Sequence, residues 1–582
     1  MKKIFVYLSF LVFITNARAQ YYLRGEIKDE QNQYLQNVNI ILHSDKNTYR
    51  SGSSGGFGIS CAYLKDSITL NLQGYETKIL AVKTDIFQQI TLKALSVNLT
   101  KTRKKLISIT RDQHFTNSNN WFLNDETYFS LIENECVNTS KYPNTAFALN
   151  INKASYSNIR RFLNTKSFVP PDAVRIEELL NYFNLHYKEP EKDKVFQIES
   201  QFSDCPWNPG KQLLFLNVNA RKLNMDKVPP SNLVFLIDAS GSMDMPNRLP
   251  LVKAAFQMLV KNLREQDTIS IVAYGGTVSV WLQPTSGAEK QKIIQSIEEL
   301  TAQGDTPGES AIRMAYTIAE KTFIKGGNNR VILATDGDFN VGEVTEKALE
   351  ELITKEKKTG VYLTCLGVGM GNFKDSKLET LAKRGNGNYA YLDDIREAEK
   401  VLVKEVTQTF YSVADNVYLN VHFNPSLVKD YRLIGFDNKR DALIDTTGEL
   451  EGGEIGSGNS VLAIFEITPV KPDSIMGNLI GAQVSLKYTI PNKKEVDEIK
   501  FNCENNYLPF SRISKDFQFA TSLAMFGMKL RDSKYLPSSD WLETERIALS
   551  SFDPTNYLQK EFVGLIGIAK KIYVKKRKKI NN

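Results

Sequence analysis

The sequence predicts a multidomain protein with a central α/β unit of the doubly wound, Rossmann-like class, flanking β-sandwich regions and C-terminal helices. Its 582 residues are enough for three or four domains. From residue 233 to residue 410, short apolar strands alternate with amphipathic helices, a pattern typical of a mostly parallel sheet with helices on both faces. Strand patterns without intervening helices lie before and after this stretch.

The first 19 residues have the pattern of a secretory signal peptide. Lys2 and Lys3 precede an apolar run at residues 4–15, which is too short to span a membrane, and Ala17-Arg18-Ala19 has the small residues of a cleavage site. The mature chain would begin at Gln20, without the cysteine of a lipoprotein anchor. We therefore expect an exported protein in the periplasm, at the outer membrane or outside the cell.

Residues 20–99 are predicted to form a small β-sandwich, because short strands alternate with turns rich in glycine and serine. The segments LRGEIKDEQNQYLQNVNIIL, GGFGIS and LQGYE resemble the carboxypeptidase regulatory-like domain. That resemblance implies a structural or docking module without catalytic residues. Residues 100–140 are polar and irregular, and we interpret them as a linker.

Residues 141–230 are expected to contain helices and then strands. The stretch 144–183 has a helical pattern in two pieces, separated at Pro170 and Pro171, and residues 196–223 alternate as strands do. Strand patterns return over residues 411–510. We expect these strands and those of residues 196–223 to form one sandwich, with the α/β unit of residues 231–410 inserted between them.

Residues 511–582 are predicted to be helical, with a basic tail at the end. Asp553 and Pro554 are residue types that cap and begin helices, so they predict the start of the last helix. Seven Lys and Arg residues lie between Lys570 and Lys579. We expect this charge to be solvated, with weak contact to an anionic membrane surface as an alternative. Without the signal peptide and this tail, the formal net charge of +7 becomes −3, which argues against nucleic acid as a partner.

Five oxygen-bearing side chains are expected at one edge of the central sheet. The strand LVFLI runs into Asp238, Ser240 and Ser242, a later loop carries Thr306, and the strand RVILAT ends at Asp336. Open parallel sheets bind ligands at the carboxyl ends of their strands. Two carboxylates and three hydroxyls are hard donors, which suit Mg²⁺, with Mn²⁺ or Ca²⁺ as alternatives, and not zinc or copper.

Such a site would bind a partner and would not hydrolyse one. If the two carboxylates act largely through water, the neutral hydroxyls leave the cation poorly neutralised, and an open coordination position attracts a further carboxylate. No histidine, lysine or cysteine is placed by the sequence as a general base. The expected partner is therefore a protein with an exposed Asp or Glu.

These five residues resemble, position by position, the metal-ion-dependent adhesion site of the von Willebrand factor type A (vWA) domain. Asp238, Ser240 and Ser242 match its Asp-x-Ser-x-Ser signature, while Thr306 and Asp336 match its later threonine and aspartate. Longer segments, among them PPDAVRIEELLNYF and DFQFATSLAMFGMKLRDSKYL, resemble an exported bacterial family of vWA proteins with a C-terminal domain of unknown function. The resemblance covers residue 144 to the end and implies the fold and the site but no known ligand. From the chemistry of the site we expect a non-enzymatic adhesion or envelope-assembly module.

Two other functions remain open. In a Mg²⁺-dependent phosphotransferase Asp238 would be the nucleophile, although enzymes of the haloacid dehalogenase type carry a second aspartate where this chain has Ser240. In a structural protein the metal would only stabilise the fold and would bind no partner. The five cysteines are far apart and predict no metal cluster, and a disulfide between Cys205 and Cys503 is left open.

Overall fold

In the computed structural model the chain forms two compact units, residues 1–111 and 112–582. The residues that the structure describes are 21–30, 32–44, 46–52, 54–72, 75–93, 126–224, 228–304, 308–337, 346–370, 373–436, 453–471, 479–491, 493–504, 506–536 and 541–580. The predicted signal peptide and Thr306 lie outside them.

The N-terminal unit consists of two small β-sheets around one apolar core. One sheet has the order β4-β1-β7, from β1 (Tyr21–Asp29), β4 (Gly56–Cys61) and β7 (Gln88–Leu92). The other has the order β3-β2-β5-β6, from β2 (Asn39–Leu42), β3 (Thr48–Arg50), β5 (Lys65–Asn71) and β6 (Lys78–Lys83). Alternating apolar side chains of both sheets are fully buried, such as Leu23, Ile27, Ile40 and Ile68.

The second unit contains a six-stranded α/β sheet with the order β14-β13-β12-β15-β16-β17. All neighbouring strands are parallel except β13 and β14, which form an antiparallel pair at one edge. The strands are β12 (Ser231–Asp238), β13 (Thr268–Gly275), β14 (Thr277–Ser286), β15 (Asn328–Thr335), β16 (Tyr362–Val368) and β17 (Tyr389–Leu392).

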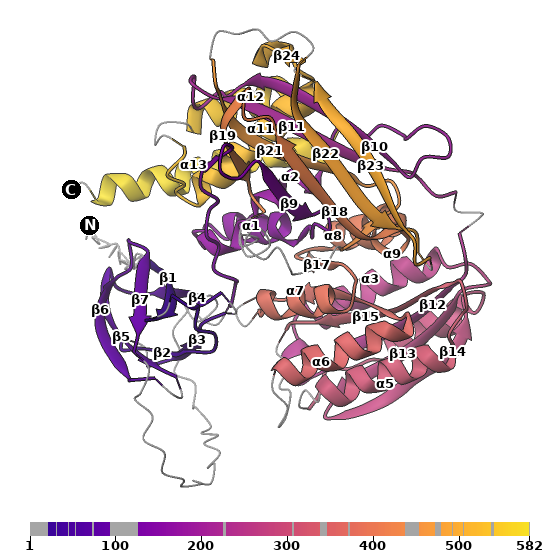
Figure 1. Ribbon diagram of the computed structural model, residues 1–582. Coiled ribbons are helices and arrows are strands. Elements are labelled where there is room, and N and C mark those ends of the chain that lie inside the picture. Colours follow the sequence, from indigo (N-terminus) through magenta and orange to yellow (C-terminus); the bar gives the residue numbers. More distant parts are fainter. Residues whose placement is uncertain are drawn as a thin grey trace, which may run out of the picture. The chain divides into compact units, whose positions relative to one another are not determined.

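Helices cover both faces of this sheet, because its central strands are apolar on both sides. Leu233, Phe235 and Ile237 of β12 pack in one core with α3 (Leu249–Lys261), α4 (Lys290–Glu298) and α8 (Ile395–Glu399). Val234 and Leu236 pack in the opposite core with α5 (Gly308–Lys321), α6 (Glu346–Glu356) and α7 (Asp375–Arg384). Figure 1 shows α5, α6 and α7 together on one side of the sheet. A π-helical turn (Lys400–Lys404) and α9 (Val406–Phe410) follow α8.

Strands from both sides of the α/β unit form one sandwich. Its larger sheet has the order β24-β10-β11-β21-β19-β8, and its smaller sheet has the order β20-β18-β22-β23, with β9 also paired to β18. Residues 212–219 of β11 pair with residues 460–467 of β21, although the whole α/β unit separates them in the sequence. The strands are β8 (Val137–Asn138), β9 (Asn144–Ala148), β10 (Phe196–Asp204), β11 (Gln212–Ala220), β18 (Ser412–Phe423), β19 (Val428–Ile434), β20 (Gly453–Gly456), β21 (Ser460–Pro469), β22 (Ile480–Thr489), β23 (Val496–Glu504) and β24 (Tyr507–Leu508).

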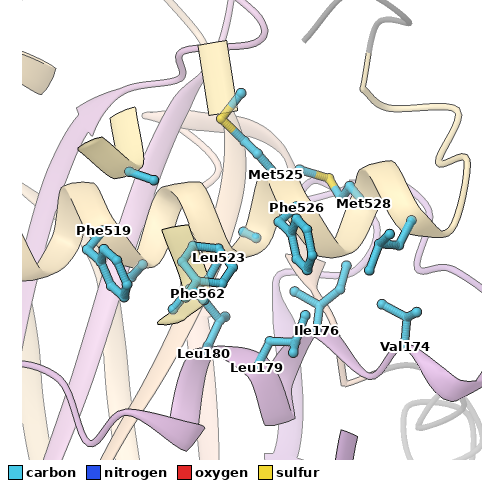
Figure 2. Packing of buried hydrophobic residues seen from close by; sticks show 14 of the residues in the cluster. Val174, Ile176, Leu179, Leu180, Phe519, Leu523, Met525, Phe526, Met528 and Phe562 are labelled. Atoms are coloured by element: carbon cyan, nitrogen blue, oxygen red, sulfur yellow. The ribbon is translucent and has the colours of Figure 1, made fainter. Parts of the chain in front are cut away.

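A layer of helices covers the outer face of the larger sheet. Ala463 and Phe465 of β21 face the sandwich core, whereas Leu462 and Ile464 face the helices. The helices are α1 (Ala154–Asn164), α2 (Ile176–Tyr182), α11 (Lys515–Leu530), α12 (Trp541–Ser551) and α13 (Tyr557–Ile580). Figure 2 shows side chains of α11 directed toward Ile176 and Leu179 of α2 and toward Phe562 of α13.

Helix α1 also joins this layer to the α/β unit. It contacts β17, the edge strand of the α/β sheet, where the Ser157 hydroxyl donates a hydrogen bond to the backbone carbonyl of Tyr391 at 2.7 Å. The guanidinium of Arg160 lies between Asp393 and Glu397 and donates to both carboxylates. All three side chains are buried, so the α/β unit is attached to its surroundings by charged contacts that water does not reach.

The structure corrects four expectations. Residues 126–140 are not part of a linker, since Tyr128 is buried in the helical core and β8 pairs with β19. Residues 144–148 form a strand because β18 offers them an edge. Helix α13 begins at Tyr557, and the side chain of Asn556 accepts from two backbone N–H groups of its first turn. Cys205 and Cys503 are free and buried, without a disulfide between them.

Within the described residues, the structure contains no helix with the length and the hydropathy needed to cross a bilayer.

Candidate metal centre

Two carboxylates meet at the carboxyl edge of the α/β sheet. Asp238 is the last residue of β12, and Asp336 directly follows β15, which lies beside β12 in parallel. Parallel neighbours end at the same edge, so both side chains are brought to one rim of the sheet. After Asp238 the chain forms a short 3₁₀ turn at Gly241–Met243 that carries Ser242. Asp238, Ser240, Ser242 and Asp336 thus share this edge.

The carboxylate of Asp238 is fully buried and is held by two donors. Its Oδ1 accepts a hydrogen bond from the backbone N–H of Ser240 at 3.0 Å, and its Oδ2 accepts one from the hydroxyl of Thr335 at 2.8 Å. Sequence reasoning missed Thr335, although a hydroxyl residue directly before Asp336 at a strand end was a usable signal. These contacts fix the orientation of the carboxylate before anything binds.

Burial, and secondarily the nearby negative charge of Asp336, raises the pKa of Asp238 to about 6. The hydrogen bonds from Ser240 and Thr335 act in the opposite direction, because they stabilise the ionised form. A buried carboxylate beside a second one is an arrangement that a bound cation would relieve.

The two serines contribute neutral oxygens at the same place. The hydroxyls of Ser240 and Ser242 lie 3.1 Å apart, with Ser240 buried and Ser242 exposed. The loop that leads toward Thr306 is adjacent, since the backbone N–H of Gly241 donates to the carbonyl of Gly304 at 3.0 Å. Thr306 itself lies outside the described residues, so its role stays a prediction.

Asp336 has a positively charged partner that sequence reasoning missed. Nη1 of Arg248 donates a hydrogen bond to Oδ2 of Asp336 at 2.6 Å and another to the backbone carbonyl of Ser242 at 2.6 Å. Nη2 donates to the carbonyl of Met370 at 3.0 Å. Arg248 precedes α3 and carries no motif signal, because only the fold brings it next to Asp336.

This set of oxygens fits a hard divalent cation. Hydroxyl and carboxylate groups are the ligands that Mg²⁺ and Ca²⁺ prefer, and Mg²⁺ commonly keeps several waters. Among the described residues, no group of three or more His, Cys, Asp or Glu side chains lies close enough to hold a metal. The donor set at this edge is accordingly one of few charges and several neutral oxygens, unlike a zinc site.

Three of the four histidines are placed at other points of the structure. His43 contacts Thr69, His186 lies between Glu199 and Asp516, and His422 contacts Asn144. His114 lies outside the described residues. The three described imidazoles are therefore engaged elsewhere than at the edge that carries Asp238.

Three family models match the chain, and together they span most of the second unit. The model described as von Willebrand factor matches residues 122–215, and the model described as von Willebrand factor type A domain matches residues 232–404. The model described as "Uncharacterized protein YfbK, C-terminal" matches residues 408–480 and 479–572. The type A domain model, over residues 232–404, covers β12 and β15 and the edge that carries Asp238 and Asp336.

Curated relatives agree with these matches. The uncharacterized protein YfbK of Escherichia coli (strain K12) is 36% identical over 468 residues, which cover 76% of this chain and 80% of YfbK. Inter-alpha-trypsin inhibitor heavy chain H2 of Sus scrofa is 21% identical over 286 residues, which are 48% of this chain and 28% of that protein.

Two solved structures align with parts of the chain. The von Willebrand factor type A protein from Catenulispora acidiphila aligns with a TM-score of 0.38 and 15% identity, over 63% of this chain and 88% of that chain. The conserved hypothetical protein BatB from Bacteroides thetaiotaomicron aligns with a TM-score of 0.26 and 20% identity, over 30% of this chain and 97% of that chain.

Proposed function

Because this chain belongs to the family of YfbK and contains a von Willebrand factor type A domain and a YfbK C-terminal domain, we propose that it is a non-enzymatic adhesion or envelope-assembly protein. It captures an exposed Asp or Glu of a protein partner through Mg²⁺ held by Asp238, Ser240, Ser242, Thr306 and Asp336. Mn²⁺ or Ca²⁺ would occupy the same oxygens.

The observation that carries this proposal is the pair of buried carboxylates at the end of β12 and β15. Asp238 is preoriented by Ser240 and Thr335, and burial next to Asp336 raises its pKa to about 6. An enclosed pair of this kind favours a cation over two protons near neutral pH. The hydroxyls of Ser240 and Ser242 supply neutral oxygens beside it.

The residues around the site favour binding over catalysis. When bound, a divalent cation with few charged ligands offers an electrophilic position to an anionic oxygen. Asp238 and Asp336 orient the site, while the neutral serine hydroxyls leave much of the cation's charge for the partner. The three described histidines lie away from this edge, so none of them is placed there as a general base.

The rest of the chain fits export and docking. The signal peptide pattern of residues 1–19 supports a location in the periplasm, at the outer membrane or outside the cell. The two-sheet N-terminal unit, which resembles a carboxypeptidase regulatory-like domain, supplies a second contact surface or fixes orientation. The basic residues near the C-terminus support weak contact with an anionic membrane surface.

The test is capture of a partner that depends on the cation. The mature chain from Gln20 is immobilised, envelope extract is passed over it in Mg²⁺, and bound protein is eluted with EDTA. The same is done with Asp238→Ala and with Asp244→Ala, a matched control that removes an exposed carboxylate from the same loop.

We expect wild type and Asp244→Ala to release the same protein on EDTA, and Asp238→Ala to capture none. Equal capture by all three would refute the cation-bridged mechanism. Phosphate release from an aryl phosphate that Asp238→Ala abolishes would instead identify a phosphotransferase.

A further inference from the structure

Arg248 connects three loops at the candidate metal centre. Its guanidinium contacts Asp336 after β15, the carbonyl of Ser242 after β12 and the carbonyl of Met370 after β16. The side chain is 9% exposed and the partner carboxylate 2%, so this ion pair is shielded from water. A positive charge therefore stands beside the oxygens proposed to hold Mg²⁺.

The space for this guanidinium is created by a glycine. A Cβ atom at Gly369 would lie 2.6 Å from Nε of Arg248, which is closer than real Cβ contacts, and 3.0 Å from its Cγ, which is tight. Gly369 also has a φ of +84°, a conformation that other residues rarely adopt. The loop after β16 is thus shaped to let the arginine side chain lie flat against it.

The arginine is held firmly at its two terminal nitrogens but not at the third. Within the described part of the chain, Nε of Arg248 is buried and has no hydrogen-bond acceptor. A buried donor without a partner costs free energy, so the hydrogen-bonding capacity of this guanidinium is only partly satisfied. The guanidinium is held by its ion pair with Asp336 and by the carbonyls of Ser242 and Met370.

We propose that Arg248 is a built-in competitor of the divalent cation for Asp336. Without the cation, the guanidinium neutralises Asp336 and ties the three loops together. The cation and the guanidinium repel each other and share one carboxylate, so cation binding draws Asp336 away from Arg248. This inference rests on the proposed function, because it concerns the same site.

Two consequences follow for the site. The affinity of the site for the cation is lower than two carboxylates alone would give, so half of the sites fill only at a higher concentration of the cation. In addition, cation binding weakens the pair of Arg248 with Asp336, which is one of the three contacts that join the loops after β12, β15 and β16, so loading loosens the link between Asp336 and the loop after β16. Arg248 is in this sense a positioning residue that couples cation binding to the shape of this edge.

The test compares two variants that differ in charge at the same position. Mg²⁺ binding to the full mature chain is measured by isothermal titration calorimetry for wild type, Arg248→Gln and Arg248→Lys. Gln removes the charge and keeps a hydrogen-bond donor, whereas Lys keeps the charge. We expect Arg248→Gln to bind Mg²⁺ on the order of tenfold more tightly than wild type, and Arg248→Lys to bind with similar affinity to wild type.

Thermal unfolding provides a second readout that a purely structural role would not give. In EDTA, Arg248→Gln should unfold at a lower temperature than wild type, because Asp336 loses its counter-charge. On addition of Mg²⁺, its unfolding temperature should rise by more than that of wild type. A residue that only braces the loops would lower both values together.

Three results would overturn the inference: weaker or equal binding by Arg248→Gln, equally tight binding by Arg248→Gln and Arg248→Lys, or no binding by any of the three proteins. The last result would also remove the proposed metal site. If the calorimetry behaves as expected but no partner is captured, the proposed function fails while the competition between Arg248 and the cation stands.

Discussion

Nη2 of Arg175 lies 2.7 Å from Oδ2 of Asp375, which joins the segment before the α/β unit to the first residue of α7 inside it. Nε of Arg175 also lies 2.6 Å from Oε1 of Glu178, and all three side chains are buried. One arginine thus compensates two buried carboxylates that belong to different layers of the protein.

Replacing Arg175 with Ala is expected to lower the free energy of unfolding by roughly 3–5 kcal/mol, because Glu178 and Asp375 would remain buried without their counter-charge. Urea denaturation followed by circular dichroism measures this change. The matched control is Lys292→Ala, which breaks a solvent-exposed pair with Glu289 and should change stability by less than about 1 kcal/mol. Similar losses of stability in both variants would show that the buried ion pair contributes no more than the exposed one.

The raised pKa of Asp238 predicts that Mg²⁺ binding weakens in acid. Below about pH 6 the carboxylate of Asp238 is protonated, and the cation must displace that proton. Calorimetric titration at pH 7.5, 6 and 5 should show affinity falling as the pH drops, by up to about tenfold per pH unit below 6. Asp244→Ala should keep this dependence. Constant affinity from pH 7.5 to 5 would rule out Asp238 as a ligand.

The same group makes the cation-free protein relatively more stable in mild acid. Because the folded-state pKa of Asp238 lies above its ordinary value, its contribution is fully present below that ordinary value and is lost as the pH rises through about 6. In EDTA, wild type should therefore gain about 1 kcal/mol relative to Asp238→Asn between pH 7 and pH 5. Urea titrations of both proteins at the two pH values give this difference, and a difference of zero would contradict the expectation.

Thr335 is expected to support the site through its hydroxyl. Thr335→Val removes the hydrogen bond to Oδ2 of Asp238, which raises the pKa of Asp238 further and weakens Mg²⁺ binding at pH 7. Thr335→Ser keeps the hydroxyl and should bind as wild type does. Calorimetric titration of the three proteins with Mg²⁺ measures this difference. Binding by Thr335→Val with the affinity of wild type would show that the Thr335 hydroxyl does not support the site.

Two helical glycines should respond in opposite directions to substitution. A Cβ at Gly527 of α11 would lie 2.8 Å from Cγ1 of Ile176, so Gly527→Leu should cost roughly 1–3 kcal/mol by forcing α11 and α2 apart. A Cβ at Gly564 of α13 meets nothing within 4 Å, so Gly564→Ala should stabilise the protein by up to about 1 kcal/mol through helix propensity. Denaturation midpoints of the two variants test this contrast, and a stable Gly527→Leu variant would contradict the close packing in Figure 2.

Local patterns in the sequence were sufficient to predict the fold of the α/β unit. Five consecutive apolar residues in β12 require cover on both faces of the sheet, and the alternation with amphipathic helices gives the parallel connections. Asp238 ends the apolar strand β12 and Asp336 directly follows Thr335 at the end of β15, so parallel pairing alone brings them to one edge. The family match of residues 232–404 agrees with that interpretation of the fold.

Contacts between distant residues decided what the sequence left open. The strand β9 forms because β18 presents a free edge, and Tyr128 is buried where its hydroxyl meets Asn158 and Arg161 of α1, although neither segment has a clear periodic pattern. The start of α13 depends on which of two side chains caps it, and Asn556 does so while Asp553 binds Thr555 instead.

The sequence by itself determined that two carboxylates and two hydroxyls lie at the end of adjacent strands, because that follows from local periodicity and chain direction. Only the tertiary structure decided that Arg248 lies against Asp336 and that Thr335 holds Asp238. The physical reason is that an ion pair between residues 88 positions apart depends on the packing of three loops, which no local pattern encodes.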